Sequence, residues 1–464
     1  MKEKLKVCLL NDSFPPVIDG VANAVINYAN IIEERYGSAV VVTPKYPNAE
    51  DSYSFRVVRY PSINIAPKIG YRAGYPLDVE TMRELEEIPM DIIHCHCPVA
   101  SAILARILRE IKKVPVIFTY HTKFDIAVSE SFGMKSMQEI AIKWLVHNIE
   151  ACDEVWVVSE GAGENLKSLG YKGEYIVMRN GADFPKGSVS AEKINALRKQ
   201  YELKEDMTLF LFVGRMMWYK GIRLSLDSLK VVKDSGKKFR MFFVGNGLEY
   251  DEIKEYVEEA GLQEECIFVG AVQDRELLRT YFSMCDLFLF PSTFDTNGLV
   301  VTEAAACETA SIVLENSCAS EGIIDGHNGF LTKEDVTYMS EKLLWVCTHR
   351  KELKEIGVHA MEEVYLSWED SVRMAQDRYQ EVIRQFDAEE NKAYEGWDEE
   401  IYAFAADAYE KMRGLEELPT EMSMHLMEEW KLQKDHMMQK RLQLKEHMKS
   451  IKSNVKNTHW KAEK

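Results

Sequence analysis

The sequence predicts an α/β protein with two doubly wound domains that face a common cleft, followed by a helical C-terminal extension. Two observations carry this prediction. Short apolar runs typical of buried parallel strands alternate with amphipathic segments of helical length, and the alternation occurs twice along the chain. A chain of 464 residues is long enough for two domains with separate cores and one further segment. We expect ligands to bind beyond the carboxyl ends of the strands, in the cleft.

The first alternating series spans residues 1–185. Its expected strands are Val7–Leu10, Ala39–Val42, Ile92–Cys95, Val116–Thr119, Glu154–Val158 and Tyr175–Met178. Its expected helices include Val21–Arg35, Ala100–Lys112 and Met137–Glu150. This order predicts a parallel sheet with helices on both faces.

The second series spans residues 186–366 and follows a linker at Gly181–Ser190. Its expected strands are Thr208–Val213, Arg240–Val244, Cys266–Val269, Asp286–Phe290 and Ser311–Leu314. Residues 367–386 have the pattern of a helix, and residues 387–464 are expected to form a helical or partly disordered tail.

Composition narrows the class of protein. Apolar residues make up 46% of the chain, but no run of about 18 of them exists, so we expect no spanning helix. The N-terminus leads directly into a strand and lacks the apolar core of a signal peptide, which favours the cytoplasm. The net charge of -18 argues against nucleic acid as a partner. The nine cysteines fall mostly in or beside apolar runs and are interpreted as small buried side chains.

The sequence His94-Cys95-His96-Cys97 is the one candidate for a metal site. It continues a predicted strand, along which side chains alternate between faces. Both histidines would then point one way and both cysteines the other, so four ligands cannot converge. We therefore expect no metal.

The most informative stretch of the chain is Pro291–Ala304. It follows a predicted strand, passes through a loop that contains Asp295, Asn297 and Gly298, and enters a helix near Leu299. Backbone N–H groups at a helix start favour an anion such as phosphate. Asp295 and Glu303, with seven residues between them, could accept hydrogen bonds from hydroxyls. A phosphate beside hydroxyls is the chemistry of a nucleotide sugar.

A second loop supports this interpretation. The strand that ends at Val213 is followed by Gly214 and Arg215, and then by Lys220 and Gly221 before another helix. Two cations beside a phosphate-binding helix start suit a diphosphate leaving group. As the sugar–phosphate bond breaks, such cations stabilise the transition state more than the ground state.

These two segments resemble the retaining glycosyltransferases of family 4, which share the two-domain, Rossmann-like GT-B architecture. The resemblance extends from Lys6 to about Gln385. The family pattern has two glutamates with seven residues between them, and here Asp295 takes the place of the first and Glu303 that of the second. The resemblance implies a hexosyltransferase that uses a nucleotide sugar, with a terminal helix, residues 367–386, that crosses back onto the first domain.

The resemblance also implies site residues in the first domain. The family's T-Y-H-T element matches Thr119–Thr122 and implies that His121 contacts the transferred sugar. The loop Phe14–Val21 matches a glycine-rich loop that meets donor and acceptor, with Gly20 kept and Asp19 in place of the first glycine. His96 would border the acceptor cleft. The alternatives are a structural histidine and an ordinary surface turn with prolines.

For the donor side, the resemblance implies catalytic roles for Arg215, Lys220 and Asp295 with His121. Donor contacts are expected from the side chains and backbone groups of Gly20, Arg215, Lys220, Gly245, Asn297, Gly298, Leu299 and Glu303. The turn Val244–Gly247 is equally consistent with an ordinary strand-to-helix turn. No D-x-D signature is present, so we expect neither a metal nor another cofactor. The proton of the acceptor would pass to the departing phosphate oxygen in a front-face transfer with retention.

One departure from the family pattern follows Glu303. The family usually has a glycine and a proline in the next turn, whereas residues 306–311 have neither, and Glu308 adds a charge near the donor side. This departure leaves the expected fold intact but puts donor preference and full activity in doubt.

The tail has its own character. Residues 431–464 carry ten Lys or Arg against three Asp or Glu. Apolar residues recur at helical spacing from Trp430 to Val455, which predicts a helix with one apolar stripe. The alternatives are a solvated or partner-packed helix, a coiled coil, and an interfacial helix on the inner face of an anionic membrane, which would suit a lipid acceptor.

The leading hypothesis is a hexosyltransferase that moves a sugar from a donor such as UDP-glucose to a hydroxyl. The loop and histidine motifs of the first domain look most similar to the diacylglycerol glucosyltransferase branch of the family. Soluble and polysaccharide acceptors remain open. A phosphorylase would need a pyridoxal lysine that we do not identify, and Asp295 with Glu308 is also consistent with a catalytically weakened sugar-nucleotide-binding scaffold.

Overall fold

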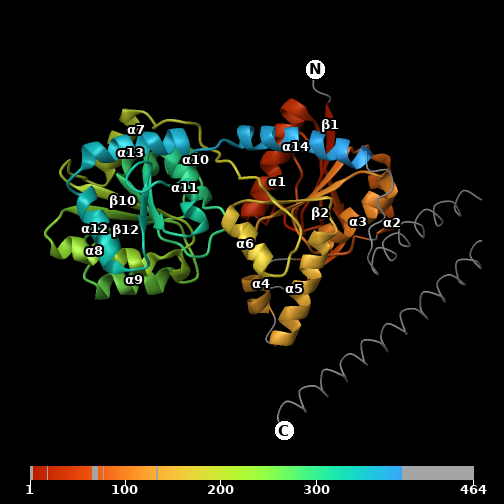
Figure 1. The fold of residues 1–464 in the computed structure, drawn as a ribbon. Coiled ribbons are helices and arrows are strands. Elements are labelled where there is room, and N and C mark those ends of the chain that lie inside the picture. The colour runs from red at the N-terminus through yellow and green to blue at the C-terminus, as the bar shows by residue number, and fades with distance from the viewer. Residues whose placement is uncertain (1–3, 18, 65–71, 77, 132–133, 389–464) are drawn as a thin grey trace, which may run out of the picture. The chain divides into compact units, whose positions relative to one another are not determined.

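The computed structural model describes residues 4–17, 19–64, 72–76, 78–131 and 134–388, which belong to one compact unit (Figure 1). The predictions for the tail, residues 389–464, and for its basic part from 431, lie outside the described residues. The described chain forms two parallel sheets covered by helices, so the predicted α/β architecture is confirmed.

The first sheet has seven parallel strands in the order β3-β2-β1-β6-β7-β8-β9. Its strands are β1 (Leu5–Leu10), β2 (Gly37–Pro44), β3 (Arg56–Tyr60), β6 (Ile92–Cys95), β7 (Val116–Tyr120), β8 (Glu154–Val157) and β9 (Ile176–Val177). The sequence missed β3, in which arginines at two of five positions hide the apolar pattern of an edge strand. A short antiparallel pair, β4 (Ser62–Ile63) and β5 (Ala73–Gly74), follows it.

The helices of the first domain connect these strands. They are α1 (Gly20–Ile31), α2 (Val79–Glu87), α3 (Ala100–Lys112), α4 (Phe124–Ser131), α5 (Lys135–Glu150) and α6 (Glu160–Ser168). The helix expected at Val21–Arg35 is α1 followed by one π-helical turn, Ile32–Tyr36. The sequence forms helix α3 because Leu104, Ile107 and Leu108 recur at helical spacing and are buried together in the core.

The second sheet has six parallel strands in the order β12-β11-β10-β13-β14-β15. Its strands are β10 (Thr208–Val213), β11 (Phe239–Val244), β12 (Cys266–Gly270), β13 (Leu287–Phe290), β14 (Ala310–Leu314) and β15 (Phe330–Thr332). Its helices are α7 (Ala191–Gln200), α8 (Ile222–Asp234), α9 (Tyr250–Glu259), α10 (Arg275–Met284), α11 (Leu299–Ala306), α12 (Val336–Val346) and α13 (Arg350–Glu363). Two 3-10 turns, η2 (Trp218–Lys220) and η3 (Cys318–Ser320), lie at strand ends.

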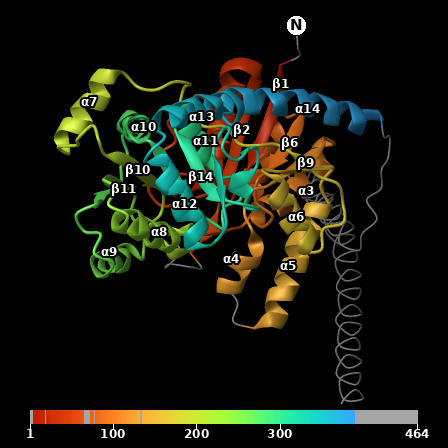
Figure 2. The ribbon, with the colours of Figure 1, turned by 60° about the vertical axis from the view of Figure 1, so that its left-hand side comes forward.

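The last described helix, α14 (Trp368–Ala388), packs against the first domain although it follows the second in sequence. Trp368, Val372 and Tyr379 are buried in one cluster with residues of the first sheet. Both ribbon views show α14 beside α1 (Figure 2). Arg378 binds the carboxylate of Glu154 in β8 with its Nε 2.9 Å from each oxygen. The described chain therefore crosses between the two sheets twice.

The strand order fixes where ligands can bind. In the first sheet β1 lies between β2 and β6, and in the second β10 lies between β11 and β13. At such switch points the loops that leave the carboxyl ends of adjacent strands diverge and open a crevice. The loops concerned follow β1, β6 and β7 in the first domain and β10, β11 and β13 in the second.

No helix of the described residues is both long and apolar enough to cross a bilayer. None of the nine cysteines, all of which lie in the described ranges, forms a disulfide, and seven of them are buried.

Candidate active site

The loop after β13 and the start of α11 form the core of the candidate site. Gly298 caps α11 with φ 63°, a left-handed conformation that suits glycine. A Cβ at this position would lie 2.9 Å from the Cβ of Ala319, so there is also no room for a side chain. The backbone of this loop is therefore held tightly where the sequence predicted a phosphate beside Leu299.

Lys220 and Asp295, which the sequence assigned to two separate loops, are in direct contact. Lys220 ends the η2 turn after β10, and its Nζ lies 2.5 Å from Oδ1 of Asp295. Gly221 has φ 75°, and a Cβ there would lie 2.0 Å from the carbonyl oxygen of Pro291. The two loops therefore press together through backbone atoms, which fixes the ion pair in the crevice of the second domain.

Two polar atoms of the same loop have no hydrogen-bond partner within the described structure. They are Oδ2 of Asp295, an acceptor, and Nδ2 of Asn297, a donor, and both are buried. Buried polar atoms are nearly always paired in folded proteins. A ligand hydroxyl can donate to one and accept from the other. The loop therefore offers the hydrogen-bonding complement of a sugar hydroxyl.

Glu303, on α11, has a partner that the sequence did not reveal. Nη2 of Arg275, the first residue of α10, lies 2.7 Å from Oε1 of Glu303 and 3.4 Å from Oδ2 of Asp183. Burial raises the pKa of the Glu303 carboxyl, and Arg275 opposes that rise. Arg275 belongs to a different β–α unit, so no local motif could identify it.

Arg215 and Gly245 lie at the same edge of the second sheet but take no part in the ion pair. Arg215 is exposed and has no hydrogen-bond or ionic partner among the described residues. Gly245 has φ 140°, and a Cβ there would lie 1.9 Å from the carbonyl oxygen of Gly214. The glycine at 245 thus allows the loops after β10 and β11 to meet, which is a structural reason for its presence.

The turn after α11 is built around Glu308. This residue adopts φ 59°, where the family pattern has glycine, and its side chain is exposed. The N–H of Thr309 donates to the carbonyl of Ala304 at 3.0 Å and closes the helix end. The turn therefore forms without glycine, but the backbone at Glu308 is strained.

In the first domain, His121 belongs to a row of three buried histidines. Its Nε2 lies 2.9 Å from Nδ1 of His96, and the two rings are stacked with centroids 5.1 Å apart. The ring of His94 lies 4.0 Å from that of His96 and contacts the hydroxyls of Thr119 and Tyr379, each at 2.6 Å. As predicted, His94 and His96 share one face, and Cys95 Sγ turns to the carbonyl of Cys97.

Burial keeps these imidazoles neutral. It lowers the pKa of His121 to about 4, with the carboxylate of Asp19 acting weakly in the other direction. It also lowers the pKa values of His94 and His96 well below the usual range. Nε2 of His96 is buried and has no partner within the described residues. The row therefore presents neutral donors and acceptors, which suit hydroxyl groups rather than phosphate.

The loop before α1, which the sequence predicted to meet donor and acceptor, is closed by its own capping residue. The Asp19 carboxylate accepts hydrogen bonds from the backbone N–H groups of Val21 at 2.9 Å and Ala22 at 2.7 Å. Asp19 is thus the N-cap of α1. A Cβ at Gly20 would meet no atom within 4 Å, so local packing does not require glycine there.

The loop after β13, which contains Asp295 and Asn297, is hydrogen-bonded to the segment around His121 in the first domain. Oγ1 of Thr296 donates to the backbone carbonyl of His121 at 2.7 Å, and Oγ of Ser159 donates to the carbonyl of Thr296 at 2.5 Å. The carboxylate of Glu321 accepts the first N–H groups of α6, from Glu160 at 2.9 Å and Gly161 at 2.8 Å. Sequence reasoning missed these contacts, since each joins residues more than 130 positions apart.

Within the described ranges, no group of three or more His, Cys, Asp or Glu side chains could hold a metal ion. The groups that the described residues bring to the site are a buried ion pair, unpaired hydrogen-bonding atoms and a row of neutral histidines.

Comparison with known proteins gives the family. The family model described as "Glycosyltransferase Family 4" matches residues 18–184, and the model "Glycosyl transferases group 1" matches residues 193–362. Together they cover every strand of the two sheets except β1. The chain belongs to glycosyltransferase family 4.

The names of the curated relatives indicate different donors and acceptors. The chain is 23% identical to an alpha-monoglucosyldiacylglycerol synthase of Streptococcus pneumoniae over 331 residues, covering 70% of this chain and 75% of the relative. It is 28% identical to a GDP-mannose-dependent alpha-mannosyltransferase of Corynebacterium glutamicum over 350 residues, covering 73% and 79%. The family-4 chain is thus a hexosyltransferase whose donor sugar and acceptor are not fixed by these relatives.

Solved structures share the fold. Sucrose-phosphate synthase from Thermosynechococcus elongatus matches with a TM-score of 0.65 at 21% identity, over 82% of this chain and 100% of that one. Anabaena HepE in complex with UDP and glucose matches with a TM-score of 0.59 at 19% identity, over 83% and 98%. The architecture of this family-4 chain is therefore the GT-B fold.

Proposed function

We propose that this chain is a retaining hexosyltransferase that transfers glucose or a similar hexose from a UDP-linked donor to the hydroxyl of a lipid such as diacylglycerol. The observation that carries the proposal is the hydrogen bond of Thr296 Oγ1 to the carbonyl of His121. It joins the loop of Asp295 and Asn297, with their unpaired acceptor and donor, to the histidine row. The sequence had assigned both segments to the sugar.

The roles of the residues follow from their charge. Lys220, with its ammonium held in the crevice, would meet the negative charge that develops on the diphosphate. Arg215, exposed at the adjacent strand end and unpaired within the described chain, is free to turn toward the same group. Asp295 and Asn297 would orient sugar hydroxyls, with neutral His121 beside them. The N–H groups behind Gly298 and Leu299 would face a phosphate.

This assignment requires no metal and no organic cofactor, because Lys220, Arg215 and the start of α11 supply positive potential. In a front-face reaction the departing phosphate oxygen takes the proton of the acceptor hydroxyl, and the new bond forms on the face from which the diphosphate leaves. The glycosidic product would then keep the anomeric configuration of the donor. We expect EDTA to leave the rate unchanged.

The decisive experiment supplies purified protein with labelled UDP-glucose, UDP-galactose or GDP-mannose, together with diacylglycerol in mixed micelles. Glycolipid formation with UDP-glucose, with α-configuration by NMR, is the expected result. Removing one group that stabilises developing charge typically lowers kcat by about 10²–10³-fold, which we expect for Lys220→Ala. Lys230→Ala, a matched change at an exposed helix pair with Asp234, should leave kcat unchanged.

Other outcomes separate the alternatives. A β-linked product would refute retention, and turnover with GDP-mannose in place of UDP-glucose would transfer the donor assignment to the mannosyltransferase relatives. Label in a soluble or polysaccharide acceptor would keep the enzyme and remove the lipid. Binding of UDP-sugars without any turnover would favour a weakened sugar-nucleotide-binding protein, for which the engaged Lys220–Asp295 pair is the supporting observation.

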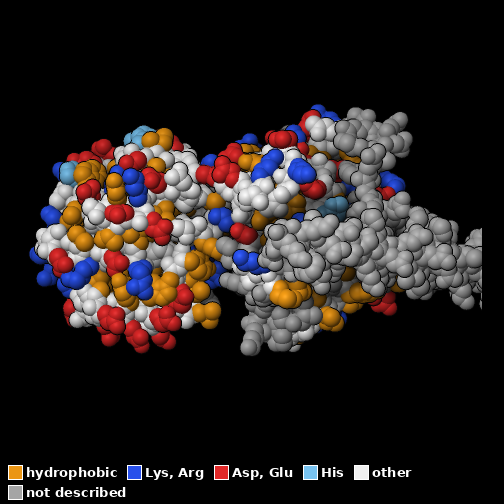
Figure 3. Space-filling model, turned by 60° about the horizontal axis from the view of Figure 1, so that its bottom comes forward, with side chains coloured by type: hydrophobic (Ala, Val, Ile, Leu, Met, Phe, Trp, Pro, Cys, Tyr) orange, Lys and Arg blue, Asp and Glu red, His pale blue; other side chains and the backbone are white. Residues whose placement is uncertain are grey.

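An exposed apolar face supports contact with a membrane. Met134, Met137, Ile140 and Trp144 recur at helical spacing at the start of α5, and their exposed fractions are 61%, 43%, 64% and 41%. Both ribbon views show α4 and α5 projecting together from the first domain. Figure 3 shows hydrophobic side chains at the lower edge of this domain.

We infer that this face dips into the interface of the bilayer that holds the acceptor. Trp and Met side chains suit the boundary between head groups and acyl chains, and the exposed Lys135 and Lys143 flank the stripe. The protein would then work as a peripheral protein on the cytoplasmic face. Flotation of Ile140→Ser/Trp144→Ser with phosphatidylcholine–phosphatidylglycerol vesicles should fall several-fold, with unchanged turnover of detergent-dispersed acceptor. Unchanged flotation would refute this contact.

A further inference from the structure

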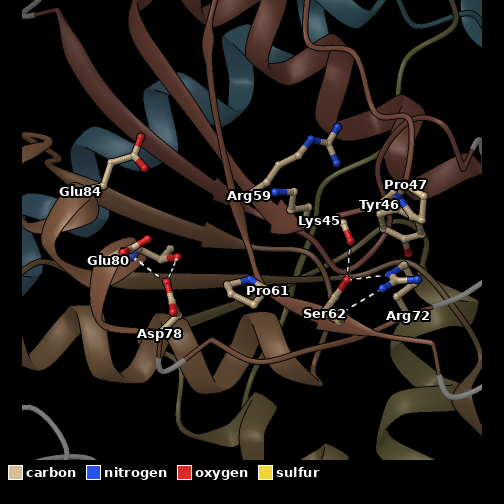
Figure 4. A pocket seen from close by; sticks show the side chains of 11 residues that line it. Lys45, Tyr46, Pro47, Arg59, Pro61, Ser62, Arg72, Asp78, Glu80 and Glu84 are labelled. Carbon is tan, nitrogen blue, oxygen red and sulfur yellow. Dashed lines mark hydrogen bonds between the residues drawn. The ribbon is translucent and has the colours of Figure 1, made fainter.

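A separate pocket of about 520 Å³ opens on the first domain (Figure 4). It lies where β2 and β3 end and where α2 begins, beside the β4–β5 pair. Its lining is mostly polar and consists of Lys45, Tyr46, Pro47, Arg59, Pro61, Ser62, Arg72, Asp78, Glu80, Thr81 and Glu84. None of these residues belongs to the loops of the donor site.

Three of the charged residues in the lining are already satisfied within the protein. Arg59 forms a two-point ion pair with Asp51, at 2.7 and 2.8 Å. Glu84 accepts from Nη2 of Arg56 at 2.8 Å. Asp78 is the N-cap of α2 and accepts from the backbone N–H of Thr81. Arg59 and Glu84 are thus neutralised by ion pairs, whereas Asp78 keeps its negative charge because its partner is uncharged.

Three other charged groups, like Asp78, have no ionic partner in the described chain. Lys45 is exposed, and its ammonium contacts no carboxylate of the described residues. Arg72 donates from Nε and Nη2 to the hydroxyl and carbonyl oxygens of Ser62, at 2.7 and 2.8 Å, both of which are uncharged. Glu80 likewise has no cationic partner within the described residues. Together with Asp78, the uncompensated charge of the pocket is thus two positive and two negative.

These charges lie on opposite walls. Figure 4 shows Lys45 and Arg72 on one side of the pocket, beside Ser62, and Glu80 with Asp78 on the other. A ligand that matches this arrangement carries an anionic group at one end and hydrogen-bond donors at the other. A phosphodiester that bears hydroxyl groups has this chemistry.

Two other lining residues, Arg59 and Tyr46, are hydrogen-bonded to the loop that leads to α1. Nη2 of Arg59 donates to the carbonyl of Pro15 at 2.8 Å, and the hydroxyl of Tyr46 donates to the carbonyl of Asp12 at 3.1 Å. The side chain of Asp12 in turn accepts from Tyr60 at 2.9 Å. A ligand in the pocket would therefore lie next to the β1–α1 loop, on the first-domain side where an acceptor is expected.

We propose that this pocket binds a hydroxyl-bearing phosphodiester, with the phosphate on Lys45 and Arg72 and the hydroxyls toward Glu80 and Asp78. The inference rests on the proposed function in one respect, that the first domain holds the acceptor side. The ligand is either a lipid head group or a free glycerophosphodiester, because both present the same atoms to the pocket.

The test uses the full-length protein and two probes, soluble glycerophosphoglycerol followed by calorimetry and phosphatidylcholine vesicles with or without phosphatidylglycerol. A hydrogen bond to a charged group contributes about 1.5–3 kcal/mol, so loss of one cation should weaken binding about ten- to a hundredfold. We expect this loss for Lys45→Ala, and a larger one for Lys45→Glu. Lys230→Ala is the control.

Glu80→Gln should strengthen anion binding, the opposite of the effect expected for Lys45→Ala. It removes a negative charge from the pocket, so inorganic phosphate should bind more tightly than to the wild type. Binding of glycerophosphoglycerol at wild-type strength by Lys45→Glu and Arg72→Ala, or its absence in the wild type with both probes, would overturn the proposal. Lys45-dependent binding to phosphatidylglycerol vesicles with none to the soluble probe would identify the lipid as the source.

The two proposals fail separately. If no nucleotide sugar is turned over but the phosphodiester binds in a Lys45-dependent way, the pocket stands and the transferase assignment falls. If glycolipid forms and Lys45→Glu changes neither the KM for acceptor nor phosphodiester binding, the transferase stands and the pocket assignment falls. Because Lys45 is exposed, neither substitution there should disturb folding; circular dichroism checks this.

Discussion

Acidification should destabilise the first domain through its row of buried histidines. Burial lowers the pKa of His121 to about 4, whereas an unfolded histidine titrates near 6.5. The unfolded chain therefore binds a proton between these values that the folded chain does not bind. Since stability rises with pH wherever the unfolded state binds more protons, the contribution of His121 is fully present above about pH 6.5 and declines as the pH falls toward 4.

The magnitude follows from the two pKa values. Integration between pH 7 and pH 5 gives a loss of about 2 kcal/mol from His121 alone. His94 and His96, whose pKa values are lowered by burial as well, add a loss of the same sign. The carboxylate of Asp19 is the charged group that opposes the shift at His121, and it is too weak to reverse it.

The assay is urea unfolding at pH 7 and at pH 5, followed by tryptophan fluorescence, to which the buried Trp156, 5.0 Å from the ring of His94, contributes. The wild type should lose more stability on acidification than His121→Gln, by about 2 kcal/mol. The variant also retains a polar side chain that can bond to His96. An equal loss in both proteins would refute the assignment of a buried neutral imidazole at position 121.

Three further predictions concern the joints of the site. Gly221→Ala should lower the free energy of unfolding by at least about 2 kcal/mol, because residue 221 has a positive φ and its new methyl group would lie 2.0 Å from the carbonyl oxygen of Pro291. The control Gly20→Ala should change the free energy of unfolding, measured in urea, by under about 0.5 kcal/mol. Thr296→Val should lower stability by about 1 kcal/mol through loss of the bond to His121 and raise the KM for donor; an unchanged KM would contradict the role of this contact. Arg275→Ala should raise the pKa of Glu303 further, so the acid limb of the kcat/KM profile should move to higher pH, and an unmoved limb would show that Glu303 does not act in its ionised form.

The local patterns of the chain determined most of the fold. Apolar runs of strand length, bounded by glycine and polar residues, predicted Ile92–Cys95 and Thr208–Val213 with their observed limits. A fully buried parallel strand must be apolar on both faces, so its sequence signal is strong. β3 was not predicted because it is an edge strand with an exposed arginine. The π-helical turn after α1 was not predicted because its sequence keeps the helical pattern.

The sequence also indicated which loops carry the site. Gly298 and Asp295 stand where a strand gives way to a helix, and such junctions gather at the carboxyl edge of a parallel sheet. Which side chains would touch could not be found in this way. The ion pair of Lys220 with Asp295 depends on the close contact between the backbones of Gly221 and Pro291. The ion pair of Arg275 with Glu303 joins two different helices.

What the sequence by itself determined, then, was the alternation of strands and helices and the position of the loops, because these depend on neighbours within a few turns of chain. The tertiary structure alone decided that Asp19 caps α1, that Thr296 bonds to His121, and that Lys45 and Arg72 have no carboxylate partner among the described residues. These outcomes depend on contacts between residues distant in sequence, for which burial and competition among many charged groups set the partner. No short-range pattern encodes that competition.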